Sequence, residues 1–241
     1  KAFPGVLRVV PISTGSGARY INKEILEPHK DFGGKTVWQA LREEIESRFK
    51  IKADRLMIED PKVIKCPNPD TGRMEKLDDI RSAQENEVVA DFLLDEVRRI
   101  TENTDIRLIT SLAGGRKTMG AMMHVSMSLL ARDGDRLTHV LVSNSAESPY
   151  LEPKFYFPIK RKVYQLKDTN GDIHKVKGSE IKIDLLDVPF LRLRQLFPKQ
   201  YGNLPGKFSQ LVGAYSERLE EAADPPEVSF NEDGHHKTIN G

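Results

Sequence analysis

The sequence predicts an α/β fold built on a mainly parallel, doubly wound sheet, followed by a smaller α+β part. Over the first 150 residues, short β-branched apolar runs alternate with amphipathic helical segments, which is the pattern of repeated β–α–β units. After that point the pattern changes to hairpins and helices. We therefore expect two domains, at residues 1–150 and 151–241.

Short apolar runs that end in turn residues mark the expected strands of the first domain, and amphipathic segments mark its helices. We expect strands at residues 6–13, 105–111 and 137–143 with two short candidates between 55 and 66, and helices at 18–26, 35–51, 82–101 and 117–131. The start of the helix at 82–101 is the best defined, because Ser82 and Glu85 have the spacing of a capping box. The helix at 35–51 repeats an apolar residue every four positions, which predicts a face turned to the core, at Val37, Leu41, Ile45 and Phe49.

Turn residues define the remaining elements. Residues 68–79 are polar and rich in turn formers, which predicts a loop or a hairpin tip. In the second domain, Asn170–Gly171 predicts the turn of a β-hairpin, and Asp233–Gly234 predicts the turn of another. Between these hairpins we expect two helices, at residues 187–197 and 206–223.

The composition argues against several classes of protein. Lys plus Arg number 37 and Asp plus Glu number 36, so the net charge is +1, which argues against direct DNA binding through a general basic surface. No apolar run approaches the length of a membrane span, so no membrane partner is expected. The single cysteine, Cys66, excludes an internal disulfide and fits a reducing, cytoplasmic location.

One turn carries the most chemistry. In "SLAGGRKTMG", residues 111–120, Gly114 and Gly115 permit close approach to the backbone, Arg116 offers a planar fork, Lys117 a point charge and Thr118 a hydroxyl at a helix N-terminus. This arrangement suits a phosphate. The P-loop pattern is not met, because Ser111 and Arg116 occupy its glycine positions. An ordinary strand–helix connection is the alternative interpretation.

Two further turns follow expected strands and carry small polar side chains. Ser13 and Thr14 follow the first strand, and Ser143 and Asn144 follow the last. In open parallel sheets ligands bind at the carboxyl ends of the strands, so the three turns together would suit a polyol phosphate such as a nucleotide. Alternatively, these residues only form turns. We expect neither a metal site nor a cofactor, because the histidines are scattered and no carboxylate pair has an arguable catalytic environment.

The methionines of the helix at 117–131 recur at helical spacing. They predict either core packing or a dimer face, at Met119, Met122, Met123 and Met127.

The motif "SLAGGRKTMGAMM", preceded by "LDDIRSAQENEVVADFL" and followed by "DRLTHVLVS" and "FYFP", resembles the CRISPR-associated Rossmann fold (CARF) proteins of type III CRISPR systems. The similarity is closest to their ring-nuclease-like branch. It implies a Rossmann-like fold and a homodimer that binds cyclic oligoadenylate, of four or six adenylates, across the two GGRKT turns. It also implies an earlier strand before Lys1, which would make residues 6–13 the second strand.

The resemblance leads to two hypotheses on function. In the first, the protein is a metal-independent ring nuclease, in which a ribose 2′-OH attacks the adjacent phosphodiester. Lys117 would stabilise the developing charge and Arg116 would fix the phosphate, while the ligand would be bound by Gly114, Gly115, Thr118, Met119, Ser13, Thr14, Ser143 and Asn144. In the second, the protein is a sensor that binds the ring intact and controls an effector. A transcription regulator is disfavoured, because the expected helix at 206–223 is acidic at its end.

Overall fold

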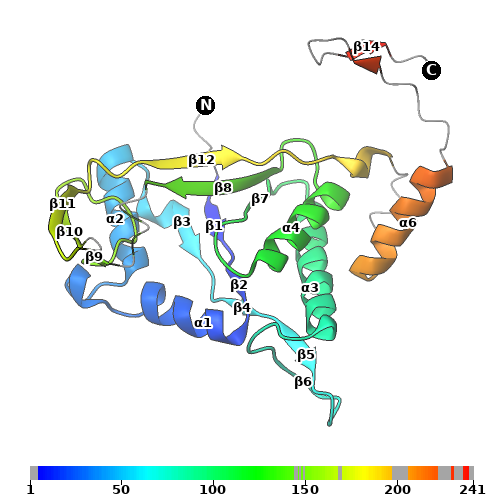
Figure 1. Ribbon diagram of the computed structural model, residues 1–241, viewed down its shortest axis with the longest axis horizontal. Helices are drawn as coiled ribbons and strands as arrows, with labels where there is room; N and C mark the ends of the chain where they lie inside the picture. The colour runs from blue at the N-terminus through cyan, green and yellow to red at the C-terminus, as the bar shows by residue number, and fades with distance from the viewer. Residues whose placement is uncertain are drawn as a thin grey trace. The chain divides into compact units, whose positions relative to one another are not determined.

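The computed structural model describes residues 5–143, 146, 148, 150–167, 170–196, 206–221, 229–230 and 236–238 (Figure 1). The chain forms two compact units, Lys1–Pro198 and Lys199–Gly241, each described here by itself. The domain boundary near residue 150 stays a prediction. Among the described residues, no helix has the length and apolar character needed to cross a membrane.

The described part of the first unit contains three parallel strand pairs. Strand β1 (Leu7–Val9) pairs with β3 (Leu56–Ile58), β2 (Ile12–Ser13) with β4 (Lys62–Val63), and β7 (Ile109–Ser111) with β8 (Arg136–Val142). The expected strands are therefore present, and the mixed α/β class is confirmed.

These parallel pairs lie in separate small sheets in the described part of the chain, rather than in one extended doubly wound sheet. Prolines explain two of the interruptions. Pro11 lies between β1 and β2, and Pro61 lies between β3 and β4. Because proline has no N–H to donate, each ladder breaks at that point.

The helices of the first unit agree with the sequence pattern. They are α1 (Gly15–Ile21), which continues as the π-helix η1 (Asn22–Leu26), α2 (Val37–Phe49), α3 (Ala83–Thr101) and α4 (Lys117–Leu130). The capping box of Ser82 and Glu85 is confirmed at the start of α3. The apolar face of α2 is confirmed only in part. Val37 is buried, but Phe49 is 61% exposed and lies under the Arg48 guanidinium.

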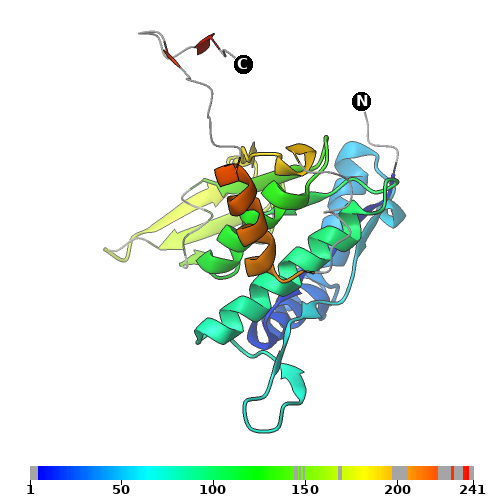
Figure 2. The same cartoon turned by 90° about the vertical axis from the view of Figure 1, so that its right-hand side faces the viewer.

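Helices α3 and α4 lie side by side and contribute to one buried core (Figures 1 and 2). Ile64, Leu77, Val89 and Leu93 form its buried centre. Met119, Met122 and Met123 pack against this cluster, and Met127 is fully buried. The methionine row is therefore core, as one of the two interpretations predicted.

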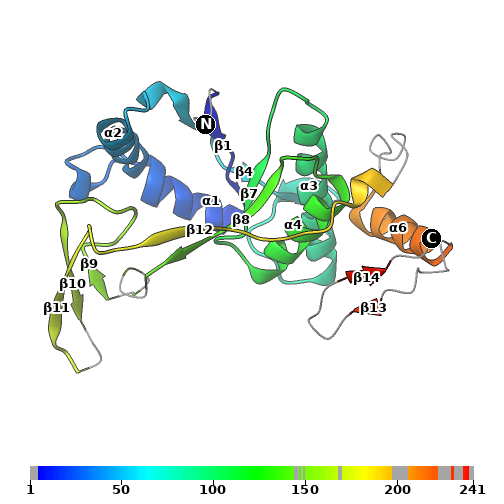
Figure 3. The same cartoon turned by 90° about the horizontal axis from the view of Figure 1, so that it is seen from above.

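Two antiparallel hairpins extend from this body. Strands β5 (Lys65–Pro67) and β6 (Met74–Lys76) form a projecting arm whose tip is the predicted polar turn (Figure 1). Strands β9 (Leu151–Glu152), β10 (Val163–Lys167) and β11 (Ile173–Lys177) form a sheet at the end remote from α3 and α4 (Figure 3). The hairpin predicted at Asn170–Gly171 is confirmed, and Gly171 has a φ of 93°.

The helix predicted at residues 187–197 is wrong. Strand β12 (Ile183–Asp187), which the sequence analysis missed, pairs antiparallel with β8, and the described residues that follow, up to Leu196, contain a 3₁₀ turn at Leu193–Leu196 instead of an α-helix. The expected start of this helix is extended instead, because Asp187 pairs with Thr138 and the N–H of Val188 donates to the carbonyl of Leu137 at 2.8 Å.

In the second unit, α6 (Phe208–Glu221) confirms the predicted helix, and β13 (Ser229–Phe230) pairs antiparallel with β14 (His236–Thr238). The predicted turn at Asp233–Gly234 lies outside the described residues.

Candidate functional site

The turn between β7 and α4 has the backbone that its glycines predict. Gly114 and Gly115 have φ values of 91° and 74°, in the left-handed region that glycine adopts without strain. A Cβ on Gly114 would meet nothing within 4 Å, so the glycine is required by conformation rather than by crowding. Helix α4 starts directly after the turn, and its N-cap, Arg116, makes no side-chain capping bond.

This turn exposes a run of backbone donors. Within the described residues, no acceptor is found for the five consecutive N–H groups from Gly114 to Thr118, and all five residues are exposed. The first turn of α4 carries no acidic side chain. The unpaired N–H groups and the helix dipole therefore make this point electropositive, which favours an anion.

Arg116 is held by an acidic residue from another segment. Its Nε donates to Oδ1 of Asp79 at 2.7 Å, and its Nη2 donates to Oδ2 of the same carboxylate. The hydrogen bonds from Arg116 lower the pKa of Asp79 to about 2, and the same contact raises the pKa of Arg116. Sequence reasoning did not assign Asp79 to the site, although Asp79 lies within the quoted "LDDIR" segment.

The neighbouring aspartate reaches a different turn. Asp78 Oδ1 lies 2.6 Å from Arg19 Nη2, and Asp78 Oδ2 accepts from Ser16 Oγ at 3.1 Å. These contacts lower the pKa of Asp78, and the hydrogen bond from Arg19 has the largest effect. Gly15 N also donates to Leu77 O at 2.7 Å. The 77–79 segment thus joins the turn after β2 to the turn before α4.

The predicted residues of the turn after β2 lie close to this segment, but both already accept hydrogen bonds from within the protein. Thr14 is buried, with 9% exposed, and its Oγ1 accepts from Gly17 N as the N-cap of α1. Ser13 is half-buried at the end of β2, and its carbonyl accepts from Ile64 N at 3.0 Å. The structure therefore brings two of the three predicted turns to one place.

The remaining predicted residues differ in their surroundings. Lys117 and Thr118 are exposed, and Lys117 has no hydrogen bond or ion pair within the part of the chain that the structure describes. Met119 is half-buried against the core below the turn. Ser143 bonds through its backbone to Lys182 and Ala146, and among the described residues it makes no hydrogen bond to the turn before α4. Asn144 lies outside the described residues.

A second polar cluster, which the sequence analysis did not predict, lies at the far end of α1. Glu24, in the π-helical segment η1, accepts from Lys154 Nζ and from Tyr156 Oη, both at 2.7 Å. Lys154 also donates to Tyr20 Oη at 2.5 Å, and Tyr156 Oη lies 3.3 Å from His29 Nε2. A π-helical turn is a geometry often found at functional sites.

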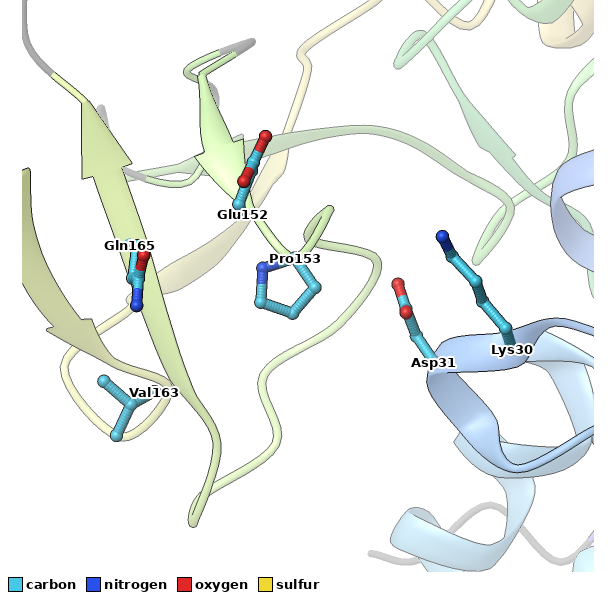
Figure 4. A pocket seen from close by; sticks show the side chains of 6 residues that line it. All are labelled: Lys30, Asp31, Glu152, Pro153, Val163 and Gln165. Carbon is cyan, nitrogen blue, oxygen red and sulfur yellow. The ribbon is translucent and has the colours of Figure 1, made fainter.

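A surface pocket of about 480 Å³ lies beside this cluster, between the 29–32 turn and the β9–β10 hairpin (Figure 4). Its lining combines one cation, two carboxylates and an amide with two apolar side chains, at Lys30, Asp31, Glu152, Gln165, Pro153 and Val163. None of the residues predicted to contact the ligand lines it. We place the candidate site at the turn before α4 instead, because that turn combines five consecutive backbone donors that lack an acceptor among the described residues with Lys117, an exposed cation that is also unpaired there.

Possible metal ligands do not gather in the described part of the chain, where no group of three or more His, Cys, Asp or Glu residues could hold an ion. Backbone N–H groups, a guanidinium and an ammonium together can bind a phosphate and stabilise additional negative charge on it.

Comparison with known proteins gives one positive result. A family model described as CRISPR-associated protein NE0113 matches residues 29–214, well over half of the chain, including the turn before α4 and both aspartates of the 77–79 segment. No curated protein and no solved structure matches the chain. The chain belongs to the family of CRISPR-associated protein NE0113.

Proposed function

We propose that this protein binds a cyclic oligoadenylate, of four or six adenylates, at the turn before α4 and cleaves it without a metal ion. The observation that supports this proposal most is the exposed run of N–H groups from Gly114 to Thr118, a segment that also carries the ammonium group of Lys117. A ring of phosphodiesters supplies anions of the size that such a backbone cradle accepts. Membership of a CRISPR-associated family supports the choice of this messenger over other nucleotides.

The proposed reaction needs positioning and charge stabilisation. The 2′-oxygen of one ribose forms a bond to the adjacent phosphorus, and the bond from phosphorus to the 5′-oxygen of the next nucleotide breaks. The proton leaves the 2′-OH for water, and the 5′-oxygen gains a proton, so the products are a 2′,3′-cyclic phosphate and a 5′-OH. Lys117 stabilises the charge that develops on the phosphorane-like transition state, while Arg116 and the N–H groups hold the phosphate in line.

The proposal includes the assembly. Two copies, each with its turn against one side of the ring, would give the symmetric grip that a cyclic ligand allows. The proposal also includes a Rossmann-like arrangement of the parallel strand pairs. It further includes a cytoplasmic location for the protein. The parallel direction of β7 and β8 supports that arrangement, because the carboxyl ends of both strands then lie at one edge, where ligands bind in open α/β sheets.

The test is to incubate the purified protein with cyclic tetra-adenylate and with cyclic hexa-adenylate, each in EDTA, and to resolve the products by mass. Linear products that carry a 2′,3′-cyclic phosphate are expected for one ring size. Tight binding of an intact ring would instead support the sensor hypothesis. If neither ring binds, the proposal is wrong.

A further inference from the structure

Arg116 presents only part of its hydrogen-bonding capacity to Asp79. A guanidinium carries five N–H groups in a plane, and two of its edges can each form a pair of parallel bonds. Asp79 occupies the edge formed by Nε and Nη2. Within the described residues, no acceptor is found for Nη1, so the edge formed by Nη1 and the second N–H of Nη2 is open.

Asp79 is itself fixed in place. Its Oδ1 accepts from the backbone N–H of Ile80 at 2.9 Å, and its Oδ2 lies 3.6 Å from Nε of Arg81. The Asp79 side chain is 23% exposed, whereas that of Arg116 is 53% exposed. The carboxylate is thus the anchored partner, and the guanidinium projects from it into solvent beside the turn.

We propose that Asp79 is a positioning residue, which holds Arg116 by one edge so that the opposite edge is ready to bind a ligand phosphate through two parallel bonds. The inference rests on the proposed function and extends it to a residue that would not touch the ligand. A free arginine side chain loses rotamer entropy when it binds, and prior fixation by Asp79 removes much of that cost. This role accounts for a carboxylate so close to an anion site, where its charge alone would oppose binding.

The opposite possibility is that Asp79 competes with the ligand for Arg116. The two roles give opposite results when the carboxylate is neutralised. Asp79→Asn keeps the shape of the side chain, and its Oδ1 can still accept from the N–H of Ile80 and from Nε of Arg116. Its NH₂ group then replaces Oδ2 and faces Nη2 of Arg116, which loses its acceptor. A positioning role predicts weaker ligand binding, whereas competition predicts tighter binding.

A double-mutant cycle separates a positioning role from a general effect on the fold. Affinity for the cyclic oligoadenylate that the wild type binds is measured for Asp79→Asn, Arg116→Ala and the double variant, with the melting temperature of each. We expect Asp79→Asn to weaken binding about tenfold in the wild type and to have no further effect with Arg116→Ala, since coupled neighbours are non-additive. An equal loss in both backgrounds, no loss, or tighter binding would overturn the inference.

The chain offers a matched control. Asp187 holds Arg136 with the same two-point geometry, at 2.7 and 2.8 Å, and the pair lies on β12 and β8 away from the turn. Asp187→Asn is expected to leave ligand affinity unchanged.

A ligand-free measurement distinguishes failure of this inference from failure of the proposed function. Nitrogen-15 relaxation of the Arg116 Nε–H should show an ordered side chain in the wild type and a mobile one in Asp79→Asn. If Arg116 is equally mobile in both, the positioning role is wrong whatever the ligand. If Arg116 is ordered as expected but the wild type binds no ring, the proposed function fails and the role assigned to the open edge fails with it.

Discussion

Lys154 and Glu24 lie 130 positions apart in the sequence and form an ion pair of 2.7 Å that links the segment before β10 to η1, which continues α1. The pair is completed by two tyrosines, because Tyr20 accepts from Lys154 and Tyr156 donates to Glu24. The hydrogen bonds from Lys154 and Tyr156 lower the pKa of Glu24. Burial opposes the charge on Lys154, but its bonds to Glu24 and Tyr20 outweigh burial and raise its pKa.

Removal of Glu24 should destabilise the first unit. In Glu24→Ala, Tyr156 and Lys154 both lose their acceptor, and we expect a loss of about 2 kcal/mol in the free energy of unfolding, measured by urea titration. Tyr156→Phe removes one bond without leaving Lys154 unpaired and should cost about 1 kcal/mol. Equal losses in the two variants would contradict the role of Glu24 as the shared acceptor.

Tyr156 should titrate late. Burial, and then its hydrogen bond to Glu24, raise its pKa to about 12. A raised folded pKa gives stability that is fully present below the unfolded value of about 10 and is lost as the pH rises through about 12. Ultraviolet titration of tyrosinate in the folded protein should therefore show a late phase that Tyr156→Phe reduces. If the late phase keeps its full amplitude in Tyr156→Phe, it belongs to Tyr164 instead. Burial raises the pKa of Tyr164 as well.

Lys117→Ala should lower the rate of ring cleavage by about 100-fold or more, because one charge-stabilising donor is lost from the transition state. Since Lys117 is exposed and unpaired in the described residues, the melting temperature should not change. Single-turnover cleavage of the bound ring is the measurement. Lys175→Ala, on the exposed β11 strand, serves as control and should cleave normally. Full activity of Lys117→Ala would refute the assigned role.

Gly114→Ala should weaken ligand binding through the backbone. The φ of 91° at Gly114 strains an alanine, and relaxation of the turn would redirect its N–H groups. Gly72, at the tip of the β5–β6 arm, has a φ of 67° and equally open surroundings, so Gly72→Ala is a matched control. Each variant should cost about 1 kcal/mol of stability, and only Gly114→Ala should affect binding. Equal affinities for the two variants would argue against a backbone contact.

The carboxyl of Asp79 should titrate at about 2 in a carbon-13 NMR experiment, because Arg116 stabilises its charged form. A lowered folded pKa gives stability that is present above the unfolded value and is lost as the pH falls through the folded one. The Arg116 contact should therefore persist throughout the neutral range and end only near pH 2. In Arg116→Ala the midpoint should move up towards the ordinary aspartate value. An unchanged midpoint would show that the ion pair does not form in solution.

Features that depend on neighbouring residues could be predicted from the sequence. The capping box at Ser82 and Glu85, helix α4 and the hairpin at Asn170–Gly171 each follow from a few adjacent side chains, and the structure confirms them. The glycine turn before α4 is equally local, since positive φ at Gly114 and Gly115 needs no distant contact.

Features that depend on distant partners could not be predicted in this way. Strand β12 exposes every residue, so its apolar pattern does not reveal a sheet face, and its pairing with β8 is long-range. Asp79 meets Arg116 across 37 positions, in the segments that lead into the packed helices α3 and α4, and this contact has no local sequence signal. Phe49 fits the helical repeat of α2, but periodicity alone does not show whether another element covers that position, and Phe49 is exposed.

The adjacency of Asp78 and Asp79 determines where this chain can change in length. Two successive side chains bind partners in different helices, Arg19 in α1 and Arg116 at the start of α4, so one residue inserted or deleted between β6 and Asp78 would direct a carboxylate to the wrong arginine. The exposed tip of the arm at residues 69–73 has no such restriction. Insertions during evolution, or tags added by design, should therefore be tolerated at the tip and excluded from the few residues that follow β6.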